Sequence, residues 1–271
     1  VSLNRDCSFY GTFTVRAATL AQLRDQIRLD PNRYNRVEAM RRFTDIERVR
    51  LIRDARAGVS DEWLETYGAT LRDPSLSPGL KSYLLQVDEQ TLDRQYLPCY
   101  RERYAARIKL LQAVAGRFYQ DLMAAFVATD TYRPAAQPKD GYMERRLKAV
   151  LLRALIEANT PAVHQIAEDH FRKAWNISDK SSALACINLS EHPRRLEIME
   201  RAYSMWKDHL SAYSTYLGIV AGGVHDDAFD RIAAEAAKPT FVIQHPTYSR
   251  SLFCSMAGNN KMLWTDRGIG W

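Results

Sequence analysis

The stretch from Pro98 to Thr129, PCYRERYAARIKLLQAVAGRFYQDLMAAFVAT, decides the fold class. Its apolar residues recur every three or four positions along the whole stretch, with only Gly116 inside it. This spacing places the apolar side chains on one face of an α-helix, and strands of such length are rare. The pattern therefore predicts helix throughout.

Similar patterns continue on the N-terminal side of this stretch. Thr19 is expected to cap a helix that carries Leu23 and Ile27 on one face. A longer helix is expected over residues 35–57, with Gly58 as its left-handed stop. The starts of three further helices are predicted at Ser60 or Asp61, at Ser77 with Pro78, and at Asp88.

On the C-terminal side, residues 129–141 form the one clear linker, with two prolines and no periodicity. The helices expected beyond it cover residues 142–157, 161–171, 179–185, 193–206, 213–220, 226–236 and 246–256. Helices joined by short turns pack as antiparallel neighbours. We therefore predict an all-α fold, an α-solenoid built as a HEAT/armadillo-like superhelix of antiparallel helix pairs. One short N-terminal segment, residues 7–16, alternates like a strand.

Composition and charge exclude several classes of protein. Hydrophobic residues make up 46% and charged residues 26%, which is typical of globular proteins. The longest apolar runs are too short for a membrane helix, and the four cysteines form no C-x-x-C pair, so we expect reduced thiols and a cytoplasmic protein without membrane contact. The net charge is +6, yet acidic residues interleave with the arginines of residues 41–56. This mixture is typical of a solvated helix face rather than a nucleic-acid surface.

No complete catalytic constellation is visible. His164 and His170 are six residues apart, which on a helix turns their side chains about 120° from each other, so they cannot share a metal ion. His164 and Glu168 share a face and are interpreted as a surface pair. Asp226 and Asp227 are interpreted as first-turn acids that favour the helix dipole. The residues themselves predict no catalytic residue and no metal site in this chain.

Several segments resemble the C-terminal helical region of bacterial-type aminopeptidase N, a zinc metallopeptidase family. FVIQHPTYSRSLFCSMAGNN, residues 241–260, is similar to the family's N-P-x-R-x-R-S-L-x-x-x-F-A-x-x-N segment, with His-Pro, Arg-Ser-Leu and Ala-Gly-Asn at matching offsets. DRGIGW, residues 266–271, is similar to its D-G-x-G-Y turn. Looser resemblances cover residues 192–219, residues 77–95 and the N-terminal VSLNRDCSFY.

This resemblance implies a domain plan. Residues 1–16 would be the tail of a preceding β-sandwich domain or a linker, and residues 17–271 the helical C-terminal domain, without its last helices. The parent protein would be a zinc-dependent aminopeptidase that removes N-terminal residues from peptides. Its zinc ligands, in an H-E-x-x-H motif, lie upstream of this chain, which would bind no cofactor. The domain's partners would be the catalytic and β domains of the same polypeptide, together with peptide substrates.

In that family the helical domain caps the active-site chamber and restricts substrate access. The resemblance places Arg250, the arginine of Arg-Ser-Leu, at the substrate channel, where its guanidinium would pair with a carboxylate or carbonyl group. From the residues alone, Arg250 is an ordinary helix arginine in a surface ion pair. Two other functions stay open: a free-standing helical-repeat scaffold that binds proteins, and an arginine-rich nucleic-acid binder.

Overall fold

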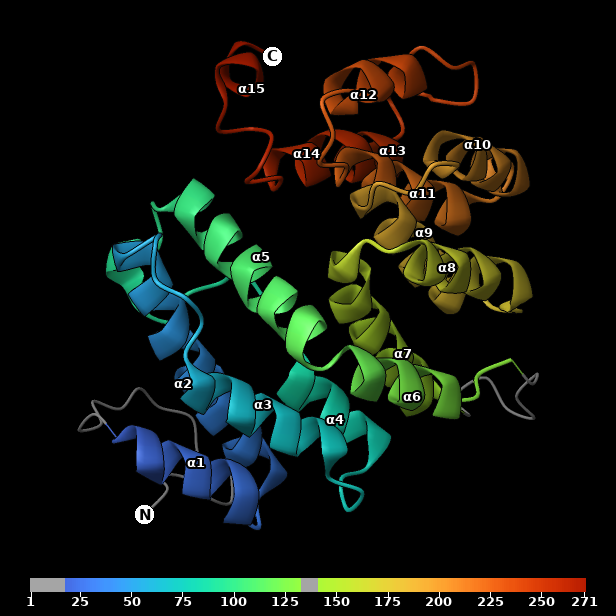
Figure 1. Ribbon diagram of the computed structural model, residues 1–271. Coiled ribbons are helices and arrows are strands. Elements are labelled where there is room, and N and C mark those ends of the chain that lie inside the picture. Colours follow the sequence, from blue (N-terminus) through green and yellow to red (C-terminus); the bar gives the residue numbers. More distant parts are fainter. Residues whose placement is uncertain (1–17, 133–140) are drawn as a thin grey trace. The chain divides into compact units, whose positions relative to one another are not determined.

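The computed structural model describes residues 18–132 and 141–271, and every regular element within these ranges is a helix (Figure 1). The all-α prediction is therefore confirmed for the described residues. The strand-like segment of residues 7–16, the domain boundary at residue 17 and most of the linker lie outside them. The chain divides into two compact units, Val1–Asp121 and Leu122–Trp271, which are described separately below.

Unit 1 begins with helices whose starts are set by local side chains. Thr19 accepts a hydrogen bond from the backbone N–H of Gln22, whose side chain accepts one from the backbone of Thr19, so the first helix starts in a complete capping box. Ser60 caps the third helix, and Ser77 caps the fourth with Pro78 in its first turn, as predicted. The elements are α1 (Leu20–Leu29), α2 (Arg33–Arg53), α3 (Asp61–Arg72), α4 (Pro78–Leu85), the 3-10 turn η1 (Arg94–Tyr96) and α5 (Tyr100–Arg117).

The core of unit 1 is centred on the aromatic residues of α3. Trp63 and Tyr67 are buried with their ring centroids 5.3 Å apart. Each polar group in this core has a partner: Trp63 Nε1 donates to Thr44 Oγ1 at 3.1 Å, and the Tyr67 hydroxyl donates to the carbonyl of Leu85 at 3.1 Å. These bonds join α3 to α2 and α4 and satisfy the polar atoms of the two buried rings.

Two predictions in unit 1 are wrong. Helix α2 ends at Arg53 rather than near residue 57, and Gly58 does not adopt a left-handed conformation. Instead Asp54 leaves the helix in an extended conformation, and its carboxylate accepts the backbone N–H of Arg56. Asp88 caps no helix, because its carbonyl and carboxylate both accept Arg48; Asp93 caps η1 instead.

The stretch from Pro98 to Thr129 is helical but broken. Helix α5 ends at Arg117, and α6 (Tyr119–Ala128) begins after Phe118, whose backbone is not helical. The Phe118 ring lies under α3, with its carbons where a Cβ on Gly68 would stand. Since Arg72 and Arg117 also lie over this ring, at 5.1 and 5.9 Å, tertiary packing rather than local sequence fixes the break.

Unit 2 is a series of helices in which α8 packs on α9, and α9, α10 and α11 pack on one another (Figure 1). Their centres are apolar, with residues such as Leu184, Met199 and Leu217 fully buried. The elements after α6 are α7 (Tyr142–Leu155), the 3-10 turn η2 (Ile156–Ala158), α8 (Pro161–Lys173), α9 (Ile177–Leu189), α10 (Arg195–Trp206), α11 (Leu210–Ala221), α12 (Ala228–Ala236), α13 (Pro246–Ser249), the π-helical turn η3 (Arg250–Cys254), α14 (Ser255–Ala257) and α15 (Asp266–Gly270).

Several helix starts in unit 2 differ from the prediction. Asn176, not Asp179, caps α9, since the Asn176 carbonyl oxygen accepts the backbone N–H of Asp179 at 2.8 Å. Helix α10 begins at Arg195 rather than at Pro193. Helix α12 begins after the predicted acidic pair, and Asp227 instead forms an ion pair with Arg195 at 2.7 Å. Asn176 is itself a preferred N-cap residue, and the ion pair with Arg195 engages Asp227 outside the helix.

Candidate functional site

The predicted channel residue Arg250 lies at the junction of α13 and η3. Pro246 occupies the first turn of α13, as expected, and the backbone then widens into a π-helical turn from Arg250 to Cys254. Turns of this kind are rare and are frequent at functional sites. Leu252 is fully buried and anchors the turn, whereas the Arg250 side chain is exposed and pairs with no described residue.

An aromatic cluster supports the segment that carries Arg250. The Tyr248 ring, from α13, contacts the buried Tyr213 ring of α11 at 5.0 Å and stacks on His245 at 4.3 Å. Phe253 contacts Phe241 at 5.9 Å. The turn is therefore fixed against α11 by rings on both sides of Arg250, so the position of the Arg250 backbone is well defined.

Behind these rings lies a set of buried polar groups. Glu235 is 3% exposed and accepts the Tyr216 hydroxyl at 2.8 Å and the Lys238 ammonium at 2.9 Å. The Lys238 Nζ atom also lies 3.4 Å from the centre of the Tyr203 ring. Burial raises the pKa of Tyr216, and the nearby Glu235 carboxylate raises it further. Tyr216 therefore stays a neutral hydrogen-bond donor, which is a structural role rather than that of a general base.

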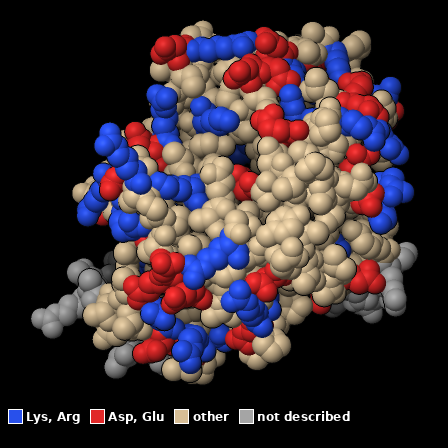
Figure 2. Space-filling model, viewed as in Figure 1, with Lys and Arg blue, Asp and Glu red and all other residues tan. Residues whose placement is uncertain are grey.

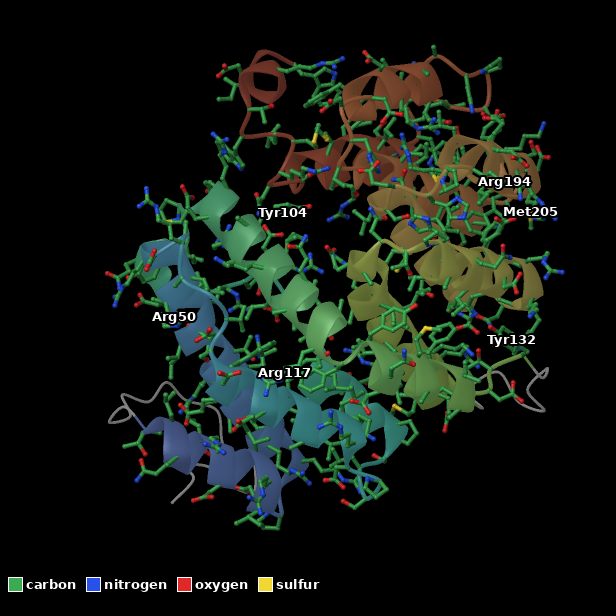
Figure 3. The ribbon with its side chains drawn as sticks, in the orientation of Figure 1. Arg50, Tyr104, Arg117, Tyr132, Arg194 and Met205 are labelled. Carbon is green, nitrogen blue, oxygen red and sulfur yellow. The ribbon has the colours of Figure 1, made fainter. Side chains whose placement is uncertain are left out.

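The histidines of α8 do not come together. The His164 Nε2 atom lies 2.8 Å from the side-chain oxygen of Asn159, and the predicted surface pair with Glu168 is wrong. Glu168 instead accepts Arg194, which is labelled in Figure 3, at 2.8 Å. Glu168 also lies 3.5 Å from His192. Burial lowers the pKa of both His164 and His192, so both rings are held neutral.

His170 belongs to a second buried cluster, which sequence reasoning missed. Its Nδ1 atom lies 3.2 Å from the Tyr132 hydroxyl, and its Nε2 atom lies 4.0 Å from Asp179. Lys148, 2% exposed, donates to the carbonyl of Thr129 at 2.6 Å and lies over the Tyr132 ring. Burial lowers the pKa of His170 to about 4, and that of Lys148 also falls. The cluster fixes the chain after α6 to α7, α8 and α9.

The arginine-rich helix α2 has mixed charge, as predicted. Arg41 pairs with Glu38, and Arg50 pairs with Glu47. Arg48 is different, because it is 2% exposed and binds Asp45 inside unit 1, which no surface pattern indicated. Basic and acidic side chains are intermixed on the face shown in Figure 2. This distribution lacks the one-signed stripe typical of nucleic-acid-binding proteins.

The described residues contain neither a metal-binding group nor a membrane-spanning helix. Within residues 18–132 and 141–271, no group of three His, Cys, Asp or Glu side chains is placed to hold a metal ion. In the same ranges, no helix combines the length and the apolar character that crossing a bilayer requires. Arg250 therefore stays a prediction of the family resemblance, at a position where its side chain is exposed.

The fold of this chain is similar to part of a solved protein structure. The structure is similar to that of Legionella pneumophila aminopeptidase A in complex with aspartic acid, with a TM-score of 0.81 and 18% sequence identity. The similarity covers 94% of this chain but only 31% of that chain, so this chain spans about a third of the length of that enzyme. No curated protein matches the chain at a significant level of sequence similarity.

Residues 20–270 match a protein family described as "Domain of unknown function (DUF3458_C) ARM repeats". Armadillo (ARM) repeats are stacked helices, so the predicted α-solenoid is confirmed. The resemblance to the C-terminal helical domain of an aminopeptidase is confirmed as well. The chain belongs to this family of ARM-repeat domains.

Proposed function

We propose that this chain is the non-catalytic helical domain of a zinc-dependent aminopeptidase that removes N-terminal residues from peptides. In this role it caps the active-site chamber and restricts access to peptides and unfolded chain ends. The observation that carries the proposal is the structural similarity, over 94% of this chain, to a part of an aminopeptidase that is about three times as long. The remaining length of such a polypeptide would contain the catalytic domain.

Zinc would be held outside this chain. The described residues offer no group of three suitable side chains, so they do not fit a zinc site. Zinc in enzymes of this type activates water and polarises the scissile carbonyl, and both tasks belong to the domain that binds it. The partners of this chain would then be the catalytic and β domains of its own polypeptide, in the cytoplasm, without nucleic acid or membrane.

Arg250 is the residue through which this domain would contact substrate. An exposed guanidinium that pairs with none of the described residues, on a well-supported turn, is available for a ligand carboxylate or carbonyl group. Its exposure also means that it contributes little to folding. These features support a binding role over the surface ion pair that the residue pattern alone indicated.

The first experiment tests the capping role in the intact polypeptide. Release of the N-terminal residue is measured from a free decapeptide and from the same sequence held within a folded protein. We expect rapid release from the peptide and at least a hundredfold slower release from the folded protein. Equal rates on both substrates would contradict the capping role, and no release from either would contradict the enzyme assignment.

The second experiment tests Arg250 by substitution in the intact polypeptide. Arg250→Ala should lower kcat/KM for peptides by about ten- to a hundredfold, because a charge-assisted hydrogen bond contributes about 1.5–3 kcal/mol. An aminoacyl arylamide, which lacks a distal carboxylate, should be far less affected. Arg201→Ala removes another exposed arginine of unit 2, one that makes no described hydrogen bond or ion pair, and is the matched control. Equal losses on both substrates would contradict the binding role.

A further inference from the structure

Unit 1 contains a cavity of 350 Å³ that the proposed function does not use. It lies among α1, the start of α2 and α3, which lie together in Figure 1. Its apolar lining comes from Ile27, Ala69 and Leu76. A volume near the lower limit of ligand pockets suits a small molecule. The other seven lining residues are polar or charged.

Most charged groups around this cavity are already paired. Arg24 binds Glu62 at 3.2 Å, and the Arg36 Nε atom donates to the carbonyl of Ile27 at 2.7 Å. The Asp73 carboxylate accepts both the backbone N–H and the hydroxyl of Ser75. These side chains shape the walls of the cavity, with the Glu62 and Asp73 carboxylates and the Arg36 Nε atom already engaged.

Two charged side chains that line the cavity, Arg28 and Glu65, have no partner among the described residues. Arg28, from α1, and Glu65, from α3, both line the cavity, and both are exposed. No described residue pairs with either of them, and no ion pair joins them to each other. Among the described residues, the cavity thus presents a cation on one helix and an anion on another that have no partner, together with apolar lining residues.

From this arrangement we infer that the cavity binds a small zwitterion with an apolar side chain, namely a free amino acid or a dipeptide. The α-carboxylate of the ligand pairs with the Arg28 guanidinium, and its ammonium group pairs with the Glu65 carboxylate. The apolar side chain lies against Ile27 and Leu76. A ligand with only one charge pairs with either the Arg28 guanidinium or the Glu65 carboxylate and leaves the other group unpaired, so it binds more weakly.

Every described residue that lines this site belongs to unit 1, whereas Arg250 belongs to unit 2. The inference therefore does not rest on the proposed peptidase activity. If that activity also holds, the ligand belongs to the chemical class of its product.

The test is equilibrium dialysis of the full 271-residue chain against radiolabelled leucine. N-acetylleucine, which lacks the ammonium group, and leucinamide, which lacks the carboxylate, serve as competitors. We expect saturable binding of one leucine per chain, with each competitor at least about tenfold weaker, as the loss of one charge-assisted contact implies. The binding should not require zinc or peptidase activity.

Substitutions then locate the site. Arg28→Gln and Glu65→Gln should each weaken leucine binding by about tenfold or more, while circular dichroism and the melting temperature stay unchanged because both side chains are exposed. Arg42→Gln and Glu102→Gln remove exposed charges of unit 1 that do not line the cavity and should leave binding intact. The inference is overturned if leucine does not bind, or if the cavity variants and the controls bind it equally well.

Discussion

Removing the buried guanidinium of Arg48 should strongly destabilise unit 1. The Arg48 side chain is 3% exposed and that of Asp45 10%, and Arg48 Nη1 donates to Asp45 Oδ1 at 2.9 Å. Arg48 Nη2 donates to the carbonyl of Asp88 at 2.9 Å, which holds the chain after α4 against α2. In Arg48→Met the apolar stem is largely kept, but both charge-assisted hydrogen bonds are lost.

The magnitude follows from what remains buried. Breaking a buried ion pair by removing one partner costs about 3–5 kcal/mol, because the other charge stays without compensation. Asp45 keeps one hydrogen bond, from the backbone N–H of Leu92 at 3.0 Å. This remaining bond favours a cost at the lower end of that energy range. The contact with the Asp88 carboxylate adds little, since that group is 37% exposed and screened by water. We therefore expect a loss of about 3 kcal/mol.

Amide hydrogen exchange measures this loss in unit 1 alone. A loss of about 3 kcal/mol should speed the exchange of the protected amides of α2 by roughly a hundredfold. Arg42→Met, on the exposed face of the same helix, should change the exchange little. Asp45→Asn combined with Arg48→Met should recover part of the loss, because the stranded carboxylate is gone. If Arg48→Met behaves like Arg42→Met, the reasoning is refuted.

Three further predictions concern other parts of the chain. The pKa of His170 is about 4 in the folded chain and about 6.5 in the unfolded chain. The neutral His170 ring therefore contributes fully to the free energy of unfolding above pH 6.5, and this contribution is lost as the pH falls towards 4. Unit 2 should lose up to about 3 kcal/mol over that range by urea unfolding, and an unchanged pH dependence in His170→Gln would contradict this cause. Gly68→Ala places a Cβ atom 2.6 Å from the Phe118 ring, which should outweigh the better helix propensity and lower the melting temperature; a higher melting temperature would show that the ring can move. Asn259→Ala removes the donor to the carbonyls of Ala221 and Gly223 at the end of α11 and should cost about 1–3 kcal/mol in calorimetry, whereas a loss below 0.5 kcal/mol would mean that water replaces the side chain.

Helix starts with a local cap could be predicted from the sequence. Thr19, Ser60 and Ser77 begin helices where expected, because each cap hydrogen bond spans only three residues. Helix ends were less predictable: α2 ends at a local turn in which Asp54 accepts Arg56, and α5 ends because of a distant partner. The break at Phe118 follows from packing beneath Gly68, which is fifty residues earlier in the chain.

Some features of the candidate site could likewise be predicted from the sequence, and others could not. The family resemblance indicated Arg250, and Pro246 predicted the helix start before it. No local pattern could show that the turn is π-helical or that the guanidinium has no described partner. The predicted pair of His164 and Glu168 was wrong because Glu168 finds Arg194, which becomes its neighbour only through the packing of the helices. The partners of Lys148 and Arg48, the carbonyl groups of Thr129 and Asp88, are likewise distant in the sequence and could not be predicted from it.

The central claim is that this chain is the helical domain of a zinc-dependent aminopeptidase. Its most direct test is the release of N-terminal residues from a peptide by the intact parent polypeptide, measured together with its zinc content. The account predicts sequential release from the N-terminus, one zinc ion per polypeptide and loss of the activity on chelation. A polypeptide that holds no zinc and releases no N-terminal residue would contradict the account.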